Sequence, residues 1–284
     1  MTTKTLINTA GILLDLSEPV VMGIINVTPD SFFPGSRTTE QEKIAERIGK
    51  VISEGAKIID IGGYSSRPGA EDVSPEEEFR RVAKAFKLVR ETDKDIAVSV
   101  DTFRAEVVKR SADEFGAFIV NDISGGEADR DMVRITGELK LPYIAMHMRG
   151  TPKDMQQNCV YDNVTAEVIA YFAERIDKYY AAGITDIIVD PGFGFAKTVD
   201  QNFELMSGLA DFKILGLPVL AGISRKTMIW KTLETTPDKA LNGTTALNWE
   251  CLRQGASILR VHDVDEAVET VALFKKYKEN FRKR

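Results

Sequence analysis

Polar side chains that could carry chemistry stand directly after a series of short apolar runs. Asp190 follows Ile187-Ile-Val and precedes Pro191-Gly192, so we expect it at the carboxyl end of a buried strand. Folds built from parallel strands place their active sites at that end. Further polar side chains of this kind stand at or near the carboxyl ends of the other apolar runs. They are Asn26, Ser65, Ser66, Arg67, Asp101, Asn121, His147, Lys226, Arg260 and His262.

These residue types indicate what kind of ligand the site would take. Carboxylates and amides can bind the donor and acceptor edge of a polar heterocycle, and arginine or lysine can bind an anion. No spacing of His, Cys, Asp and Glu fits a dedicated metal cage, and no order of Ser, His and Asp suggests covalent catalysis. The pattern therefore predicts a ligand with a polar heterocycle and a negatively charged group.

Some of these residues also have structural explanations. A strand-terminating aspartate often caps the next helix, so each such carboxylate taken alone is ambiguous. We expect Asp60, which lies inside a strand, to make a structural buried hydrogen bond, and His147 to be a satisfied core histidine. Arg260 lies within an apolar run, where an unpaired guanidinium costs several kcal/mol. It needs a negative partner, and we expect a ligand phosphate.

The elements that must position these residues alternate between strands and helices. Eight apolar runs suit buried strands, and stretches of helical periodicity separate them. Eight such units without a linker favour the α/β class and a closed (β/α)₈ TIM barrel over an open doubly wound sheet. The expected strands begin at Val20, Lys57, Ile96, Phe118, Tyr143, Ile187, Pro218 and Ile258.

We expect one TIM-barrel domain over residues 1–284, with residues 1–18 as an extension at its N-terminus. Leu6-Ile-Asn and Ile12-Leu-Leu bracket Thr9-Ala-Gly11, which predicts a short β-hairpin that plugs the bottom of the barrel. Helices are expected from about 39 to 54, 74 to 90, 164 to 182 and 265 to 281. In the second of these, Ser74 is expected as the N-cap.

Composition limits the classes of partner. The chain has 284 residues and a net charge of −6, and its basic residues form no long run before the last helix, so nucleic acid is not expected as a partner. Cys159 and Cys251 have no disulfide or zinc spacing. No apolar run reaches about 18 residues and no signal peptide is recognisable, so we expect no membrane partner and a cytoplasmic location.

Eight motifs, taken together and in order, resemble the dihydropteroate synthase family of pterin-binding barrels. The likeness extends from about Val20 to the C-terminus. The motifs are Asn26-Val-Thr-Pro-Asp-Ser-Phe32, Ile59-Asp-Ile-Gly-Gly-Tyr-Ser-Ser-Arg-Pro-Gly69, Ser99-Val-Asp-Thr-Phe103, Asn121-Asp-Ile-Ser-Gly125, Met146-His-Met-Arg-Gly-Thr-Pro152, Asp190-Pro-Gly-Phe-Gly-Phe195, Gly222-Ile-Ser-Arg-Lys226 and Arg260-Val-His262.

The resemblance implies a transferase of folate biosynthesis that is a sulfonamide target. Such an enzyme joins 6-hydroxymethyl-7,8-dihydropterin diphosphate to para-aminobenzoate, with Mg²⁺, by a dissociative substitution that yields 7,8-dihydropteroate and diphosphate. It also implies a homodimer formed through the late helices. By resemblance, Asn26 is the metal ligand, and Asp101, Lys226 and Arg260 are catalytic. The implied substrate-binding residues are Phe32, Ser66, Arg67, Pro68, Asp101, Asn121, Met146, Asp190, Phe195, Lys226, Thr227, Arg260, Val261 and His262.

Two departures and two alternatives accompany this resemblance. The family usually has Glu where Tyr64 stands and Thr where Ser66 stands; Ser66 keeps the hydroxyl, but Tyr64 changes charge and bulk.

A methyltetrahydrofolate methyltransferase would share the Asp and Asn heterocycle site but needs no clamp for a diphosphate. An inactive pterin-binding paralogue is the second alternative. A diphosphate-release assay separates the first from a synthase, and rescue of a folate auxotroph separates the second.

Overall fold

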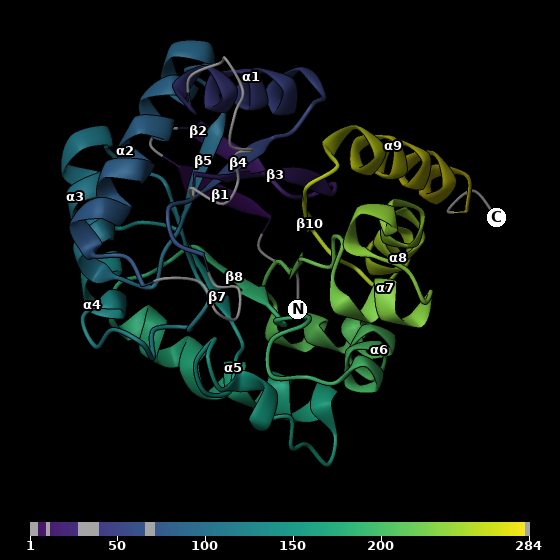
Figure 1. The fold of residues 1–284 in the computed structure, drawn as a ribbon. Helices are drawn as coiled ribbons and strands as arrows, with labels where there is room; N and C mark the ends of the chain where they lie inside the picture. The colour runs from purple at the N-terminus through teal and green to yellow at the C-terminus, as the bar shows by residue number, and fades with distance from the viewer. Residues whose placement is uncertain (1–4, 10–11, 28–39, 66–71, 282–284) are drawn as a thin grey trace.

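Eight parallel strands form the centre of the molecule (Figure 1). The computed structural model describes residues 5–9, 12–27, 40–65 and 72–281. The sheet order is β8-β7-β6-β5-β4-β3-β10-β9, and a parallel bridge between Val189 and Val219 brings its two edges together into a nearly closed barrel. The strands are β3 (Val20–Asn26), β4 (Ile58–Gly62), β5 (Ala97–Asp101), β6 (Ile119–Asp122), β7 (Tyr143–Met146), β8 (Ile187–Asp190), β9 (Leu220–Ala221) and β10 (Ile258–Val261).

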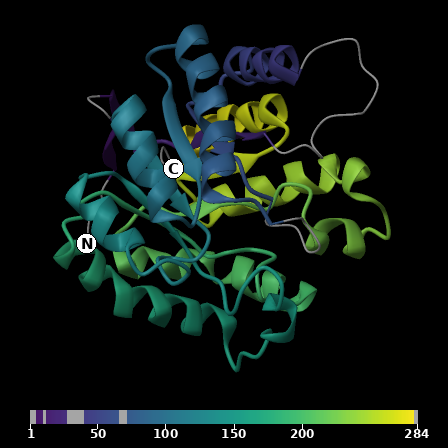
Figure 2. The same cartoon turned by 60° about the vertical axis from the view of Figure 1, so that its left-hand side comes forward.

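Helices surround the strands, and α1 and α5 lie on opposite sides of the barrel in both views (Figure 1, Figure 2). The predicted barrel class is therefore confirmed. The α-helices are α1 (Glu40–Ser53), α2 (Pro75–Thr92), α3 (Ala105–Phe115), α4 (Met132–Glu138), α5 (Val164–Ala181), α6 (Val199–Ser207), α7 (Thr227–Thr232), α8 (Leu241–Arg253) and α9 (Val264–Phe281), with short 3₁₀ helices η2 (Met155–Gln157), η3 (Leu209–Leu215) and η4 (Pro237–Lys239). Within the described residues, no helix is long and apolar enough to span a membrane.

The hairpin of β1 (Leu6–Thr9) and β2 (Ile12–Asp15) closes the end of the barrel where the strands begin. Ile7, Leu14 and Leu16 are buried there in one apolar cluster. The other members of that cluster come from the first residues of the strands and point inward, as alternation along a strand requires. They are Met22, Ile58, Ala97, Ile119, Ile144, Ile188, Leu220 and Ile258. The predicted plug is thus present, and it leaves the opposite end of the barrel for the site.

Local signals account for where the main helices begin. Ser74 accepts a hydrogen bond from the backbone N–H of Glu77, and Pro75 occupies the first helical position of α2, as predicted. Thr198 and Gln201 form a capping box at the start of α6. These caps mark the residues at which α2 and α6 begin.

The structure differs from the expected elements mainly in length. We expected β9 to begin at Pro218, but it comprises only Leu220 and Ala221 as a regular strand. Proline has no backbone N–H to donate to a sheet, and here the carbonyl of Pro218 instead accepts from the N–H of Val189 at 3.0 Å. The barrel closes through that contact, so the short strand leaves the topology unchanged.

Candidate active site

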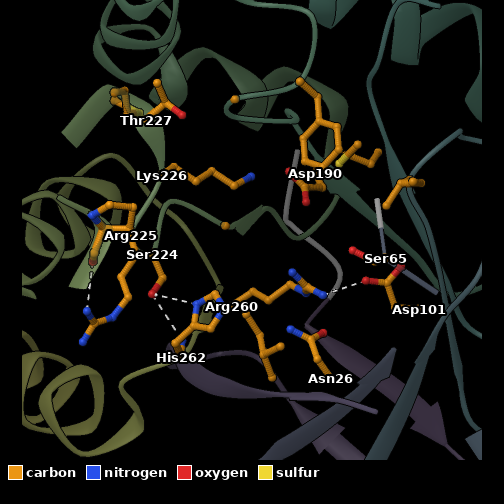
Figure 3. A pocket seen from close by; sticks show the side chains of 18 of the residues that line it. Asn26, Ser65, Asp101, Asp190, Ser224, Arg225, Lys226, Thr227, Arg260 and His262 are labelled. Atoms are coloured by element: carbon orange, nitrogen blue, oxygen red, sulfur yellow. Dashed lines mark hydrogen bonds and ion pairs between the residues drawn. The ribbon is translucent and has the colours of Figure 1, made fainter. Parts of the chain in front are cut away.

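A cavity of about 1300 Å³ opens at the carboxyl ends of the strands. Residues at or just after the end of each barrel strand line it, which is the arrangement expected of a barrel active site. Figure 3 shows the side chains of Lys226, Asp190, Asp101 and Arg260 facing the same hollow, with Asn26 beside Arg260. The prediction that these distant positions converge on one mouth therefore agrees with the geometry of the cavity.

Asp60 of β4 is the buried centre of a hydrogen-bond network at the base of the cavity. Its carboxylate accepts from the Ser99 hydroxyl, and from Asn121 Nδ2 at 3.2 and 3.3 Å. Arg260 Nε donates to Asp60 Oδ2 at 2.6 Å, and Arg260 Nη2 donates to Asp101 Oδ2 at 2.7 Å. One carboxylate thus fixes an amide and a guanidinium relative to each other. The negative partners of Arg260 in this structure are carboxylates, where we had expected a phosphate.

The environment of this network controls the charge on Asp101. Burial is the main cause that raises the pKa of Asp101 to about 7; Arg260 opposes this net shift and the neighbouring Asp60 carboxylate adds to it. A carboxyl group with a pKa near neutrality changes charge over the physiological range. Asp101 can therefore present an anion to the cavity at neutral pH and lose it under mildly acidic conditions.

The loop after β8 is held by hydrogen bonds to its backbone. The carboxylate of Asp190 accepts from the N–H of Gly192 at 2.8 Å, and Lys226 donates to the carbonyl of Phe193. The Lys226 ammonium also lies 4.7 Å from the ring centroid of Phe195. Gly192 has φ +73°, and a side chain there would collide with the carbonyl of His147, so only glycine fits this turn. Asp190 and Phe195, together with Lys226 from the segment after β9, thus present an acid, an aromatic face and a cation on one side of the cavity.

Lys197 supports the same loop from below. Its ammonium donates at 3.0 Å each to the carbonyls of Gly192 and Phe195, and lies 3.0 Å from His147 Nδ1. Burial lowers the pKa of Lys197 to about 7 and that of His147 to about 2. Since the lysine can only donate, the neutral histidine accepts at Nδ1 and carries its proton on Nε2. His147 is buried, as expected of a core histidine.

Side chains around His262 form the opposite wall. Both the backbone N–H and Nδ1 of His262 contact the Ser224 hydroxyl, at 3.2 and 3.3 Å. Arg225 makes a bidentate pair with Asp263, at 2.9 and 2.8 Å, and donates to two backbone carbonyls of η4. Burial lowers the pKa of His262 to about 4, with Arg260 adding to the shift. His262 is therefore a neutral donor or acceptor at pH 7.

Aromatic and charged side chains pack around Tyr64, just after β4. Arg104 lies between the rings of Tyr64 and Phe103, 5.2 and 5.1 Å from their centroids, and the two rings meet edge to face. Arg104 Nη1 also donates to the buried Glu78 at 2.7 Å and to the carbonyl of Val73 at 2.6 Å. The family that this sequence resembles usually has Glu at this position. Here Tyr64 instead packs against the guanidinium of Arg104 and the ring of Phe103.

Most of the predicted site residues lie together. Val261 does not line the cavity, because alternation along β10 turns its side chain into the core between the barrel and the helices. Phe32, Ser66, Arg67 and Pro68 fall outside the described residues. The predicted residues that line the cavity are Asn26, Asp101, Asn121, Met146, Asp190, Phe195, Lys226, Thr227, Arg260 and His262.

Several residues at the cavity had no predicted role. For Lys197 the sequence offered only its position after a glycine-rich loop. For Ser224 it gave no indication of a role of its own. The sequence does indicate a role for Arg47 of α1, because Arg47 lies on the same helix face as the apolar residues Ile44, Ile48 and Val51. A cation on the inward face of a helix predicts a polar contact there, and Arg47 Nη2 donates to the carbonyl of His262 at 2.5 Å.

Together, these groups can bind a flat heterocycle and stabilise a separation of charge. Asp190, Asn121 and Lys226 offer acceptors and donors deep in the cavity, while Asp101 and Arg260 place opposite charges 2.7 Å apart at its base. Burial of these groups strengthens their electrostatic interactions with a ligand, because the surroundings screen them less than water. This is a site for binding a polar ring and for stabilising charge that develops beside it.

Comparison with known proteins places this fold and site in a class. The family model described as a pterin binding enzyme matches residues 22–262. These residues include every barrel strand except the first two positions of β3, and all of the lining residues named above. The chain therefore belongs to the family of pterin-binding enzymes.

Several relatives of the chain are dihydropteroate synthases. It is 43% identical over 263 residues to the dihydropteroate synthase of Escherichia coli K12, covering 92% of each chain. The Xanthomonas albilineans dihydropteroate synthase solved with 4-aminobenzoic acid superposes with a TM-score of 0.89 at 38% identity, covering 97% of this chain and 99% of that one. The same enzyme with 7,8-dihydropteroate gives a TM-score of 0.86 at 35% identity, covering 96% and 98%.

Proposed function

We propose that this chain is a dihydropteroate synthase of folate biosynthesis. It condenses 6-hydroxymethyl-7,8-dihydropterin diphosphate with para-aminobenzoate and releases diphosphate. The observation that supports this most directly is the convergence of Asp190, Asn121 and Lys226 with Asp101 and Arg260 in one cavity. The first three suit the edge of a pterin, and the last two suit the carbon from which diphosphate departs. Relatives that carry this name match nearly the whole chain.

The pterin ring is recognised by groups of fixed position. Asp190 presents two carboxylate oxygens to the adjacent N–H donors of the pyrimidine edge, and the N–H of Gly192 holds that carboxylate in place. Asn121 binds a further ring nitrogen and the amino group, and its amide is fixed by Asp60. Lys226 donates to the ring carbonyl; burial lowers the pKa of Lys226 to about 8, so it is mostly protonated at pH 7.

The reaction is a dissociative substitution. The C–O bond to the diphosphate breaks first, the electron pair leaves with the diphosphate, and the ring nitrogens delocalise the positive charge left on the exocyclic carbon. Asp101 stabilises that charge electrostatically, because its carboxylate is held by Arg260 within the cavity. The amine of para-aminobenzoate then forms the C–N bond and releases a proton. Met146 adds an apolar wall beside the ring.

The residues on the diphosphate side fit Mg²⁺ as the cofactor. Asn26 lines the cavity beside Arg260 (Figure 3), and the described residues contain no group of three or more His, Cys, Asp and Glu that could hold a metal ion. A hard cation that keeps waters and substrate oxygens needs few protein ligands, and one amide oxygen suits it. Mg²⁺, when bound, would neutralise the diphosphate as a Lewis acid. Asn26 would hold it, while Arg260 and His262, with Ser66 and Arg67, would hold phosphate oxygens.

The aminobenzoate would lie against the mouth of the cavity. Phe195 offers an aromatic face, and Thr227 offers a hydroxyl at the start of α7. The ring of Phe195 is placed by the loop contacts of Lys197. Phe32 and Pro68 would complete this slot from the two loops beyond the described residues.

We also propose a cytoplasmic homodimer that forms through the late helices. Apolar side chains exposed on these helices support an interface there. They are Leu233, Leu273 and Tyr277, exposed by 52%, 67% and 50%. Sedimentation analysis of the purified protein tests this, and a monomer at micromolar concentration would contradict it.

A turnover assay tests the proposed reaction. The purified protein is given dihydropterin diphosphate and para-aminobenzoate, with and without Mg²⁺, and both dihydropteroate and diphosphate are measured. We expect equal amounts of the two products and strong dependence on Mg²⁺. Diphosphate release without dihydropteroate, or the absence of both products, would contradict the proposal.

A further inference from the structure

Three arginines act electrostatically on His262, and two of them are already neutralised. Arg225 is committed to Asp263 by its bidentate pair. Arg260 is shared between the carboxylates of Asp60 and Asp101, which balance its charge and leave it fewer N–H groups for a phosphate. Arg47 differs from both, because no carboxylate of the described chain lies within 4.0 Å of its guanidinium.

Arg47 is held in place without losing its charge. It occupies the inward stripe of α1, between the buried Ile44, Ile48 and Val51, and its side chain is half-buried at the cavity wall. Nη2 donates to the carbonyl of His262 at 2.5 Å. Within the described part of the chain this is the one hydrogen bond that the guanidinium donates, and it leaves further N–H groups for a ligand.

The other cations that line the cavity contact other groups, and one of them is exposed to solvent. Lys226 lies beside a strand-end aspartate and donates to a loop carbonyl. Lys197 donates to two carbonyls beneath the β8 loop. Lys231 is exposed on α7, with its ammonium 5.9 Å from the ring centroid of Trp230. Among the described residues near His262, Arg47 is therefore the guanidinium that has no carboxylate partner and could offer its charge to a diphosphate.

We infer that Arg47 is a binding residue for the diphosphate group, supplied by α1 rather than by a strand-end loop. This inference rests on the proposed function, and it adds a guanidinium to the residues that hold the leaving group. The planar guanidinium can donate two parallel hydrogen bonds to phosphate oxygens. Because it contacts the departing group and not the ring, its contribution is confined to ligands that carry the diphosphate.

Calorimetric titration of Arg47→Met tests the inference. Methionine keeps the helix and the apolar stripe but removes the charge. We expect the affinity for inorganic pyrophosphate, and for the pterin diphosphate, to fall roughly 10- to 100-fold, as for loss of a charged hydrogen bond. Affinity for the free hydroxymethyl pterin should stay within about twofold. Arg47→Lys, which keeps the charge but not the fork, should lose less. Lys50→Met, on an exposed position one turn along the same helix, is the matched control.

Three outcomes would overturn the inference. The first is wild-type affinity of Arg47→Met for pyrophosphate. The second is an equal loss of affinity for free pterin and pyrophosphate, as a purely structural role would require. The third is a loss of pyrophosphate affinity in Lys231→Met but not in Arg47→Met, which would move the role to α7. The wild-type turnover assay distinguishes these from failure of the proposed function, because wild type would then release no diphosphate at all.

Discussion

Replacing Asp60 by asparagine should weaken the hydrogen-bond network at the base of the cavity. The side chain is fully buried, and it accepts hydrogen bonds from Ser99, Asn121 and Arg260. In Asp60→Asn one of the two oxygens becomes an NH₂ group, which cannot accept. At least one of the three donors then faces another donor, and the guanidinium loses its second negative partner.

The size of this effect follows from the contacts. A hydrogen bond to a charged group is worth about 1.5–3 kcal/mol, so we expect Asp60→Asn to lower the free energy of unfolding by about that amount. Asp60→Ala, which leaves all the donors unpaired, should cost about 3–5 kcal/mol. Solvent screening reduces these figures little, because the side chain of Arg260 is only 21% exposed.

The same substitution has an electrostatic consequence that a purely structural defect lacks. The negative charge of Asp60 helps to raise the pKa of Asp101. Without it that pKa falls, so the acid limb of the pH profile of turnover should move below about 7. Urea unfolding and steady-state kinetics measure the two effects. Asp113→Asn, exposed on α3, is the control. Unchanged stability together with an unmoved acid limb would refute the role given to Asp60.

Three further predictions concern other parts of the molecule. Lys197→Met removes the ammonium that holds two loop carbonyls; it should raise the KM for aminobenzoate in steady-state kinetics and leave the Kd of pterin unchanged. Turnover should fall below about pH 7 as Asp101 is protonated and above about pH 8 as Lys226 loses its proton, so Lys226→Arg should extend the alkaline limb in a pH–rate profile. Ile7→Ala should cost about 2–5 kcal/mol by urea unfolding, whereas Leu13→Ala, 62% exposed in the same hairpin, should cost little.

The barrel could be predicted because its signals are local. Tyr143–Met146 is apolar throughout and Ile258–Val261 is apolar except for Arg260, as suits strands covered on both faces, and both appear with the predicted bounds. The N-cap at Ser74 is similarly local. The hairpin could also be predicted as a plug, because nothing else would bury the apolar face of Ile7 and Leu14.

The partners of the site residues could not be predicted in the same way. The need of Arg260 for a negative partner follows from its burial, but the choice of Asp60 and Asp101 depends on strand register, with Asp60 opposite Ser99 and Asp101 opposite Asn121. Lys197 illustrates the same limit, since its three acceptors come from the loop after β8 and from His147, just after β7. Such contacts depend on tertiary placement, which local spacing does not encode.

The central claim is that Asp190 binds the pterin ring, whereas separate cations bind the diphosphate. Calorimetric titration of Asp190→Asn with the free hydroxymethyl pterin, and then with its diphosphate, tests this most directly. We predict that both ligands lose affinity by the same factor, roughly 10-fold or more, because the lost contact is to the ring that they share. Wild-type affinity for free pterin in this variant would contradict the account.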